Sequence, residues 1–179
     1  MYDARVFATL RKMIQRRGFD TPAIINESHT LFCKPGKRLL MYYLEIDTKA
    51  GVGVVREITK KMHALEVEDA IIICGSTTPP AYTAFRDLLS QNLHITVFSP
   101  ASLMFDIFEH HDVPHHRILS AAEKHTLLIS QHLQESDLPI IRLDDAMAKY
   151  LGARVSDVFE ITRIRPNVGA HFYYRIVRE

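Results

Sequence analysis

The sequence has no tryptophan, two cysteines and seven glycines among its 179 residues. Cys33 and Cys74 lie far apart and neither belongs to a C-x-x-C pair, which argues against a zinc ribbon or a paired redox motif and favours a reducing compartment. No apolar run is long enough to span a membrane, and the first residues lack the apolar core of a signal peptide. We therefore expect a soluble intracellular protein with no membrane partner.

An excess of charge of either sign is also missing. The chain carries 22 Lys and Arg against 21 Asp and Glu, which gives a formal net charge of +1. Because this balance creates no long-range attraction to nucleic acid, any such binding has to come from local patches. The length allows about 70% of the unfolded surface to be buried, in one medium domain or two small ones.

The familiar catalytic motifs are absent as well. The sequence contains no G-x-S-x-G, no P-loop and no H-E-x-x-H. Glu45, Asp47 and Lys49 lie at the end of an expected strand and resemble half of a metal-dependent nuclease site, in which carboxylates hold a divalent cation. A convincing first acid on a preceding strand is missing, so a nuclease remains the less favoured alternative.

Helical and extended patterns alternate through the first 108 residues. Apolar residues at helical spacing predict helices over residues 3–17, 54–65, 81–92 and 99–108. Mostly apolar runs predict strands at residues 38–46, 69–74 and 94–98, and residues 21–37 are expected to be a loop-rich connection. Strands that alternate with helices predict an α/β domain with partly parallel pairing, ending near Phe108.

The C-terminal stretch has a different order. An extended segment at residues 138–141 precedes a short helix over 145–151, which Gly152 ends because a left-handed residue without Cβ fits there. Residues 157–164 alternate with a period of two, and residues 171–177 form a second β-rich run after the turn formers at 166–169. These features predict a β-hairpin.

This C-terminal stretch resembles a module of the fifth subunit shared by eukaryotic RNA polymerases I, II and III, and of the small archaeal counterpart of that protein. The resemblance rests on an ordered series of short motifs, L-P-x-I, D-x-x-A-x-Y-x-G, V-x-x-I-x-R and a final Tyr-Arg-Ile. They fall on Leu138, Pro139, Ile141, Asp145, Ala148, Tyr150, Gly152, Val158, Ile161, Arg163, Tyr174, Arg175 and Ile176. No single motif is specific, but the ordered set is.

The resemblance implies a non-catalytic subunit of a multisubunit DNA-directed RNA polymerase, with no cofactor and no metal. It implies an α/β N-terminal jaw domain with a restriction-endonuclease-like sandwich at residues 1–108. A small α+β C-terminal assembly module with a β-hairpin is expected at residues 109–179. The jaw would lie near downstream duplex DNA, and the C-terminal module would dock on the largest subunit.

Histidines are concentrated where the second module is expected to begin. Four of them, His110, His111, His115 and His116, lie within seven residues of sequence. Imidazole is a common ligand of zinc and nickel, so a metal site is one interpretation. We favour a linker, because relatives of the resembled family carry histidine and Val-Pro-x-His at this point. A capping box at Ser120 and Glu123 then predicts a helix.

Two sets of residues would contact partners if the resemblance holds. The DNA-proximal loop of the family has the sequence T-P-S-A in eukaryotic members, and here it is expected at Thr77, Thr78, Pro79, Pro80 and Ala81. Proline in place of serine removes a hydroxyl, so contact with DNA should be weak and non-specific. The expected docking residues are Pro139, Ile140, Arg142, Asp145, Met147, Tyr150, Gly152, Arg163, Phe172 and Arg175.

The length of the chain bears on its origin. Archaeal members of the resembled family have only the C-terminal module, whereas eukaryotic members have a longer N-terminal domain. A divergent copy or one encoded by a large DNA virus would explain a shortened jaw. The expected location is the nucleus for a cellular protein, or the host nucleus or cytoplasm and the virion for a viral one. A stand-alone nucleic-acid-binding or scaffold protein is the main alternative function.

Overall fold

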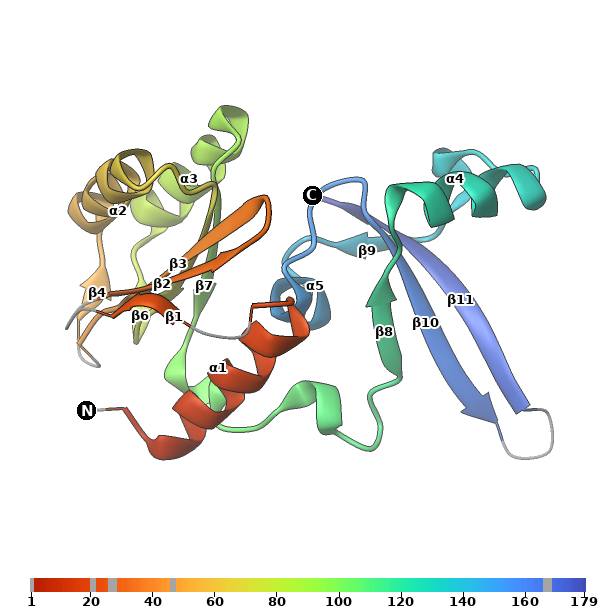
Figure 1. Ribbon diagram of the computed structural model, residues 1–179, viewed down its shortest axis with the longest axis horizontal. Coiled ribbons are helices and arrows are strands. Elements are labelled where there is room, and N and C mark those ends of the chain that lie inside the picture. The colour runs from red at the N-terminus through yellow and green to blue at the C-terminus, as the bar shows by residue number, and fades with distance from the viewer. Residues whose placement is uncertain (1, 20–21, 26–28, 46–47, 166–168) are drawn as a thin grey trace. The chain divides into compact units, whose positions relative to one another are not determined.

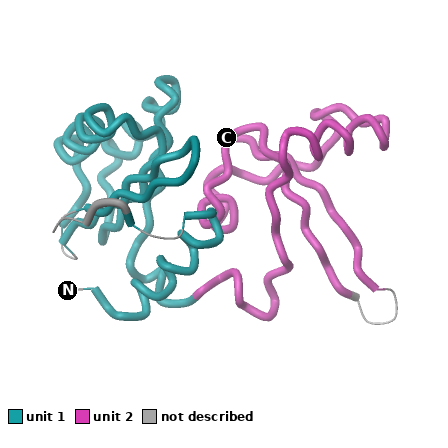
Figure 2. Tube along the Cα trace, in the orientation of Figure 1, with its two compact units in different colours: residues 1–105 teal, residues 106–179 magenta. Residues whose placement is uncertain are grey.

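The chain forms two compact units, residues 1–105 and residues 106–179, each with its own sheet in this computed structural model (Figures 1 and 2). The structure describes residues 2–19, 22–25, 29–45, 48–165 and 169–179. The division falls three residues before the position 108 that the sequence pattern predicts. In the described parts of the chain no helix is both long and apolar enough to cross a membrane.

Unit 1 is built on a five-stranded sheet with the order β1-β2-β3-β5-β7. The strands are β1 (Pro22–Ile25), β2 (His29–Lys34), β3 (Lys37–Tyr43), β5 (Asp69–Ile73) and β7 (His94–Phe98). Strands β3, β5 and β7 pair in parallel, as the alternation of strands and helices predicts, while β1 and β2 add an antiparallel edge.

Helices cover both faces of this sheet (Figure 1). The apolar stripes of α2 (Val52–Ala64) and α3 (Pro79–Asp87) pack with alternate residues of β3 and β5, such as Leu40 and Ile72. Helix α1 (Ala4–Arg16) buries its own stripe, including Leu10 and Met13, over the other face of the sheet. Because β5 is covered on both sides, its run of isoleucines is fully buried.

Two predictions for unit 1 were wrong. Strand β2 lies inside the expected loop-rich connection, where it pairs with β3 from His29 to Lys34 and buries Leu31. The expected helix at residues 99–108 is replaced by two short 3₁₀ turns, η2 (Pro100–Leu103) and η3 (Ile107–Glu109). Asp106 is extended and its side chain accepts a hydrogen bond from the Phe108 N–H, so a new turn begins there.

Unit 2 is a four-stranded sheet with the order β8-β10-β11-β9. Its elements are β8 (His115–Ile118), α4 (Ala121–Ser130), η4 (Glu135–Asp137), β9 (Ile140–Arg142), α5 (Ala146–Leu151), β10 (Val158–Arg165) and β11 (Gly169–Arg178). The hairpin that the period of two predicts is present, with Val158 opposite Ile176 and Arg165 opposite Gly169. Residues 166–168 of its predicted turn lie outside the described residues.

Alternation along the hairpin gives unit 2 two cores. Val158 and Ile176 point to one face and pack with Leu119, Leu127 of α4 and Leu138. Their neighbours point to the other face, where Phe159, Ile161 and Val177 pack with Ile141 and Ala148 of α5. Both faces at the base of the hairpin are therefore apolar and buried.

A polar ladder joins three strands of unit 2 to the start of α4. The Arg117 guanidinium donates to Glu160 at 2.9 and 3.2 Å and to Glu123 at 2.5 Å, and Tyr174 Oη donates to Glu160 at 3.3 Å. Glu123 also completes the predicted capping box with Ser120. Hydrogen bonds from Arg117 and Ser120 lower the pKa of Glu123 to about 2.

We predict that Phe159→Ala destabilises unit 2 strongly. Phe159 has no exposed surface, and truncation of a buried phenylalanine typically costs about 3–5 kcal/mol. Phe172→Ala, on the same hairpin but 57% exposed, should cost less than about 1 kcal/mol. Denaturant unfolding of the two variants measures the difference, and equal losses would contradict the core described above.

We also predict that acid weakens unit 2 through His116. Its ring packs edge-on to Phe159 and its Nδ1 lies 2.6 Å from the Pro114 carbonyl oxygen, and burial lowers its pKa below 6.5. The unfolded chain therefore binds the proton more tightly, so stability should fall as the pH drops below about 6.5. His116→Gln should flatten this part of the pH profile of unfolding, whereas His125→Gln, at an exposed position, should leave it as in the wild type.

Candidate nucleic-acid and partner interfaces

The carboxyl ends of the parallel strands of unit 1 meet at one edge of the sheet, here called the carboxyl edge. Two short strands, β4 (Lys49–Ala50) and β6 (Ser76–Thr77), pair in parallel there. The Thr78 N–H and hydroxyl donate to the Ala50 carbonyl at 3.1 and 3.3 Å. The expected DNA-proximal loop thus lies beside the segment that contains Lys49, and both α2 and α3 begin at this edge.

The five residues of the expected DNA-proximal loop differ in exposure. Thr77 and Thr78 are half-buried, and Thr77 Oγ1 lies 3.8 Å from the Cys74 sulfur. Ala81 is fully buried in the core, so Pro79 and Pro80 are the members that expose their side chains. Because proline has no N–H, the first turn of α3 offers few backbone donors to a phosphate. This loop therefore exposes two prolines and carries no charged side chain.

The residues of the nuclease alternative are only partly described. Glu45 and Lys49 are exposed near the carboxyl edge, and Asp47 lies outside the described residues. Within the described ranges, no three His, Cys, Asp or Glu side chains are placed to hold a metal ion. In the histidine-rich segment, the His115 ring packs against Phe108 at 5.3 Å, and His111 Nδ1 lies 3.2 Å from Asp112.

An aromatic group at the carboxyl edge was not predicted from the sequence. Tyr2 Oη donates to the carbonyl oxygens of Leu44 and Ile73, the latter at 3.1 Å, and thereby ties the chain before α1 to the ends of β3 and β5. The Phe7 ring packs at 6.3 Å from that of Tyr2 and 6.0 Å from that of Tyr43. Burial raises the pKa of both tyrosines. Phe7, on the helix that the sequence predicts over residues 3–17, is 43% exposed.

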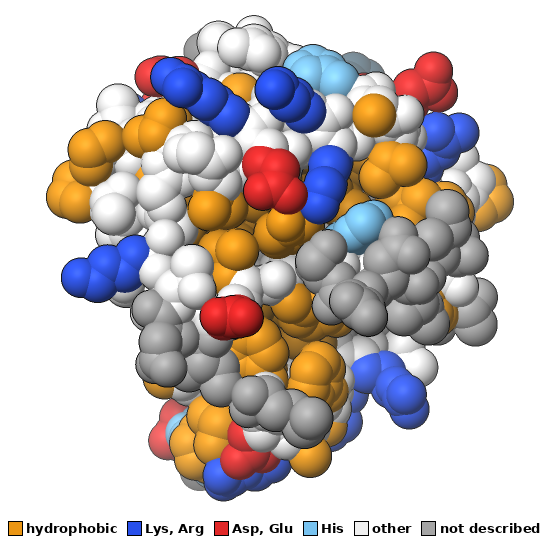
Figure 3. Space-filling view, turned by 90° about the vertical axis from the view of Figure 1, so that its left-hand side faces the viewer, with side chains coloured by type: hydrophobic (Ala, Val, Ile, Leu, Met, Phe, Trp, Pro, Cys, Tyr) orange, Lys and Arg blue, Asp and Glu red, His pale blue; other side chains and the backbone are white. Residues whose placement is uncertain are grey.

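A space-filling view of unit 1 shows how charge and apolar surface are mixed (Figure 3). Lys and Arg side chains surround an area of exposed apolar side chains, and acidic side chains lie among them. The exposed apolar residues of this unit include Tyr82 of α3, at 53%. The face is therefore not uniformly basic, in keeping with the near-zero net charge of the chain.

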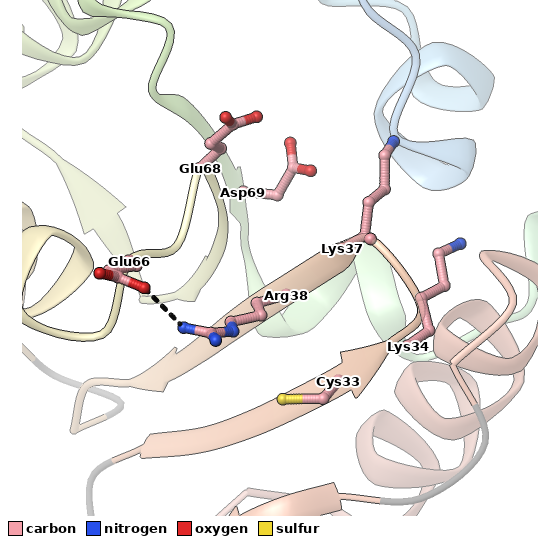
Figure 4. Close-up of a pocket in the computed structure, with 8 residues that line it drawn as sticks. Cys33, Lys34, Lys37, Arg38, Glu66, Glu68 and Asp69 are labelled. Atoms are coloured by element: carbon pink, nitrogen blue, oxygen red, sulfur yellow. Dashed lines mark hydrogen bonds and ion pairs between the residues drawn. The ribbon is translucent and has the colours of Figure 1, made fainter.

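A pocket of about 360 Å³ lies at the opposite, amino-terminal end of the parallel strands (Figure 4). It is lined by Cys33, Lys34, Gly36, Lys37, Arg38, Glu66, Glu68 and Asp69. Arg38 donates to the Leu65 carbonyl at 2.9 Å and to Glu66 at 3.4 Å, and Lys34 Nζ donates to the Arg17 carbonyl at 2.5 Å. Three cations and three carboxylates leave this pocket with no net attraction for phosphate.

The expected docking residues of unit 2 divide into exposed and buried groups. The exposed ones are Pro139, Ile140, Arg142, Asp145, Arg163, Phe172 and Arg175, and Gly152 is half-buried. Met147 and Tyr150 are only 6% and 1% exposed. Tyr150 Oη donates to Asp106 at 2.8 Å and its ring stacks at 6.1 Å from Phe108, so it holds α5 to the start of unit 2. These two side chains lie inside the unit.

The D-x-x-A-x-Y-x-G motif has a structural explanation. Asp145 caps α5, accepting a hydrogen bond from the Met147 N–H at 2.8 Å. Ala148 is fully buried in a core cluster, and Gly152 ends the helix with a left-handed φ of 69°. The motif therefore specifies a short capped helix and its packing more than it specifies an exposed surface.

The end of the hairpin carries the most exposed apolar surface of unit 2. Phe172 and Ile164 lie on the same face, because Thr162 is opposite Phe172 and Ile164 is opposite Ala170. Ile164 is 82% exposed and was not among the expected docking residues. Val158, Thr162 and Ile164 fall on one face of β10 by the period of two in the sequence, and this pattern could have identified Ile164 as a further candidate. Arg163 lies on the other face, 5.1 Å from the Tyr173 ring.

Comparison with known proteins identifies the family. The model of the RNA polymerase Rpb5 C-terminal domain matches residues 105–177. RNA polymerase subunit RPABC1 of Caenorhabditis briggsae is 33% identical over 144 residues, which are 80% of this chain and 67% of that protein. The counterpart in Dictyostelium discoideum is 31% identical over 159 residues, covering 86% and 80% of the two chains. Subunit Rpo5 of Pyrococcus horikoshii is 47% identical over 75 residues, 92% of its length but 42% of this chain.

The lengths of these matches agree with the division of the chain into two units. The archaeal protein aligns over a length close to that of unit 2 alone, whereas the eukaryotic relatives extend into unit 1. The resemblance inferred from the ordered C-terminal motifs is confirmed. The chain belongs to the family of the fifth common subunit of DNA-directed RNA polymerases (Rpb5, RPABC1 and Rpo5), a non-catalytic component of those enzymes.

Proposed function

We propose that unit 2 docks this chain on the largest subunit of a multisubunit RNA polymerase, and that unit 1 forms part of a jaw beside downstream duplex DNA. The observation that carries the docking half is the apolar end of the hairpin, where Ile164 and Phe172 are 82% and 57% exposed on one face. Permanent interfaces are usually large and apolar, and exposed side chains of this kind gain most from burial.

Polar residues around the hairpin would orient the docked module. Arg163 and Arg175 are exposed on strands β10 and β11, and Arg175 Nη1 lies 3.4 Å from the Ile140 carbonyl oxygen. Arg142 is held by Asp144 at 2.8 Å through two of its nitrogens. Pre-ordered guanidinium groups suit the rim of an apolar interface, since little side-chain entropy is lost on binding. Ile140, 58% exposed, would add apolar area.

The DNA half of the proposal rests on the loop at residues 77–81. Its exposed prolines allow close approach to a sugar-phosphate backbone, and such contacts position a duplex without distinguishing its sequence. The loop itself carries no cation, so its contact with a duplex should be weak and should contribute little to the salt dependence of binding.

The location follows from the host of the polymerase. A cellular protein would act in the nucleus with RNA polymerases I, II and III as partners. A copy encoded by a large DNA virus would act in the host nucleus or cytoplasm and could be packaged in the virion. In each case the partners are the largest subunit, other polymerase subunits and downstream DNA. Recovery of no polymerase subunit with the tagged chain would favour the stand-alone scaffold instead.

We predict that Ile164→Ser with Phe172→Ser weakens assembly. Both side chains are exposed, so the double variant should fold normally yet recover at least severalfold less of the largest polymerase subunit in affinity purification of the tagged chain from its native source. Ile129→Ser on α4, where the side chain is 60% exposed, is the matched control and should recover as much as the wild type. Equal recovery by all three proteins would contradict docking through this face.

We predict that Pro80→Glu weakens duplex binding. A carboxylate about 4 Å from a phosphate in water costs about 1 kcal/mol, and this raises Kd about fivefold. An acid in the first turn of a helix is favourable, so α3 should remain intact. Fluorescence anisotropy with a labelled DNA duplex at low salt measures the change, and Pro80→Gln is the neutral control. If Pro80→Glu and Pro80→Gln bind as the wild type does, the loop does not lie near DNA.

A further inference from the structure

The solvent-facing side of α2 carries cations that the described structure leaves without an ion-pair partner. Arg56 and Lys60 are both exposed and lie four residues apart, so they project from the same side of the helix. Val55, Ile58 and Met62 form the buried stripe. Within the described residues, neither Arg56 nor Lys60 makes an ion pair or a side-chain hydrogen bond.

The one acid of α2 is already neutralised. Glu57 lies 3.0 Å from Lys61 Nζ and accepts a hydrogen bond from Tyr42 Oη at 2.8 Å. These bonds lower the pKa of Glu57, so its charge is committed to Lys61. Lys61 lies at the same time 4.6 Å from the centre of the Tyr42 ring. Arg56 and Lys60 therefore remain as an uncompensated positive stripe, called the α2 stripe below.

The α2 stripe begins about one helical turn from the carboxyl edge and runs away from it along α2. Helix α2 begins at Val52, directly after β4, which pairs with β6 at the start of the DNA-proximal loop. With a rise of about 1.5 Å per residue, Arg56 lies about 6 Å along the helix from Val52 and Lys60 about 6 Å beyond it. Along the axis of a duplex the phosphates of one strand recur about every 3.4 Å, so this spacing corresponds to about two steps of axial rise.

The neighbouring helix α2 carries exposed cations, which the DNA-proximal loop lacks. Pro79 and Pro80 carry neither a charge nor a backbone N–H. At the amino-terminal end of the sheet, the three cations that line the pocket are balanced by three carboxylates. We propose that the α2 stripe, Arg56 and Lys60, is a contact surface for the phosphate backbone of duplex DNA that extends the DNA-proximal loop. This inference rests on the proposed jaw function and adds the residues that would provide its electrostatic attraction.

The test compares two double variants of the full chain that remove the same charge. Arg56→Gln with Lys60→Gln removes the α2 stripe. Arg11→Gln with Lys37→Gln removes two other exposed cations of unit 1, on α1 and at the start of β3. Fluorescence anisotropy with a labelled duplex is recorded over a range of salt concentrations, and thermal unfolding by circular dichroism checks that both proteins are folded.

The expected result is a loss of salt dependence in the first variant alone. Each lost phosphate contact removes about 0.9 from the slope of log K against log salt, so the slope should decrease in magnitude by about 2 and low-salt affinity should fall. The control should keep the wild-type slope. Equal losses in both double variants would overturn the inference, because net charge alone would then explain them.

The two proposals fail in different ways. If the α2 variant keeps the wild-type slope while Pro80→Glu weakens binding, the stripe is not a contact surface and the proposed loop contact stands. If the wild-type chain binds the duplex without salt dependence, the stripe is wrong, and if it shows no affinity for the duplex at all, the DNA half of the proposed function is wrong as well. An acidic protein segment would then be the occupant to test next.

Discussion

Both units depend on the alternation of side chains along buried strands. In unit 1, β3 and β5 send successive residues to opposite faces, so α1 is needed on one face and α2 with α3 on the other. In unit 2, the same alternation along β10 and β11 divides the apolar residues between two cores. A shift of register by one residue would exchange these sets, which is why the pairing is so strongly specified.

Parallel pairing in unit 1 separates two ends of the sheet with different electrostatics. The amino-terminal end gathers cations and carboxylates that interact with one another, as Arg38 does with Glu66. The carboxyl edge gathers the starts of α2 and α3 and two prolines, and the cations of α2 that have no such partner among the described residues lie about one and two turns along the helix from it. The net charge of +1 therefore describes neither end of the sheet.

Several residues of the family motifs in unit 2 have structural roles: they cap or end α5 or are buried in the unit. Tyr150 and Met147 were expected to contact a partner, yet both are buried, and Tyr150 is hydrogen-bonded to Asp106. A motif that combines a helix cap, a small packing residue and a left-handed glycine stabilises both ends of a helix that is too short to be stable by itself. The most exposed large apolar side chain of unit 2 is Ile164, near the end of the hairpin, where it continues the alternation of β10 beyond the buried core.

The sequence alone determined the elements whose signal is local. The capping box at Ser120, the glycine that ends α5 and the period of two in β10 are set by neighbouring residues, and all were predicted. Strand β2 and the replacement of a helix at residues 99–108 by short turns were missed, because pairing with β3 and the cap at Asp106 decided them. For the sites, the DNA-proximal loop at residues 77–81 and the docking set stay predictions from the family resemblance. Only the tertiary structure separated buried Tyr150 from exposed Phe172 and placed the start of α2 beside the loop, since burial and neighbourhood depend on contacts between distant residues.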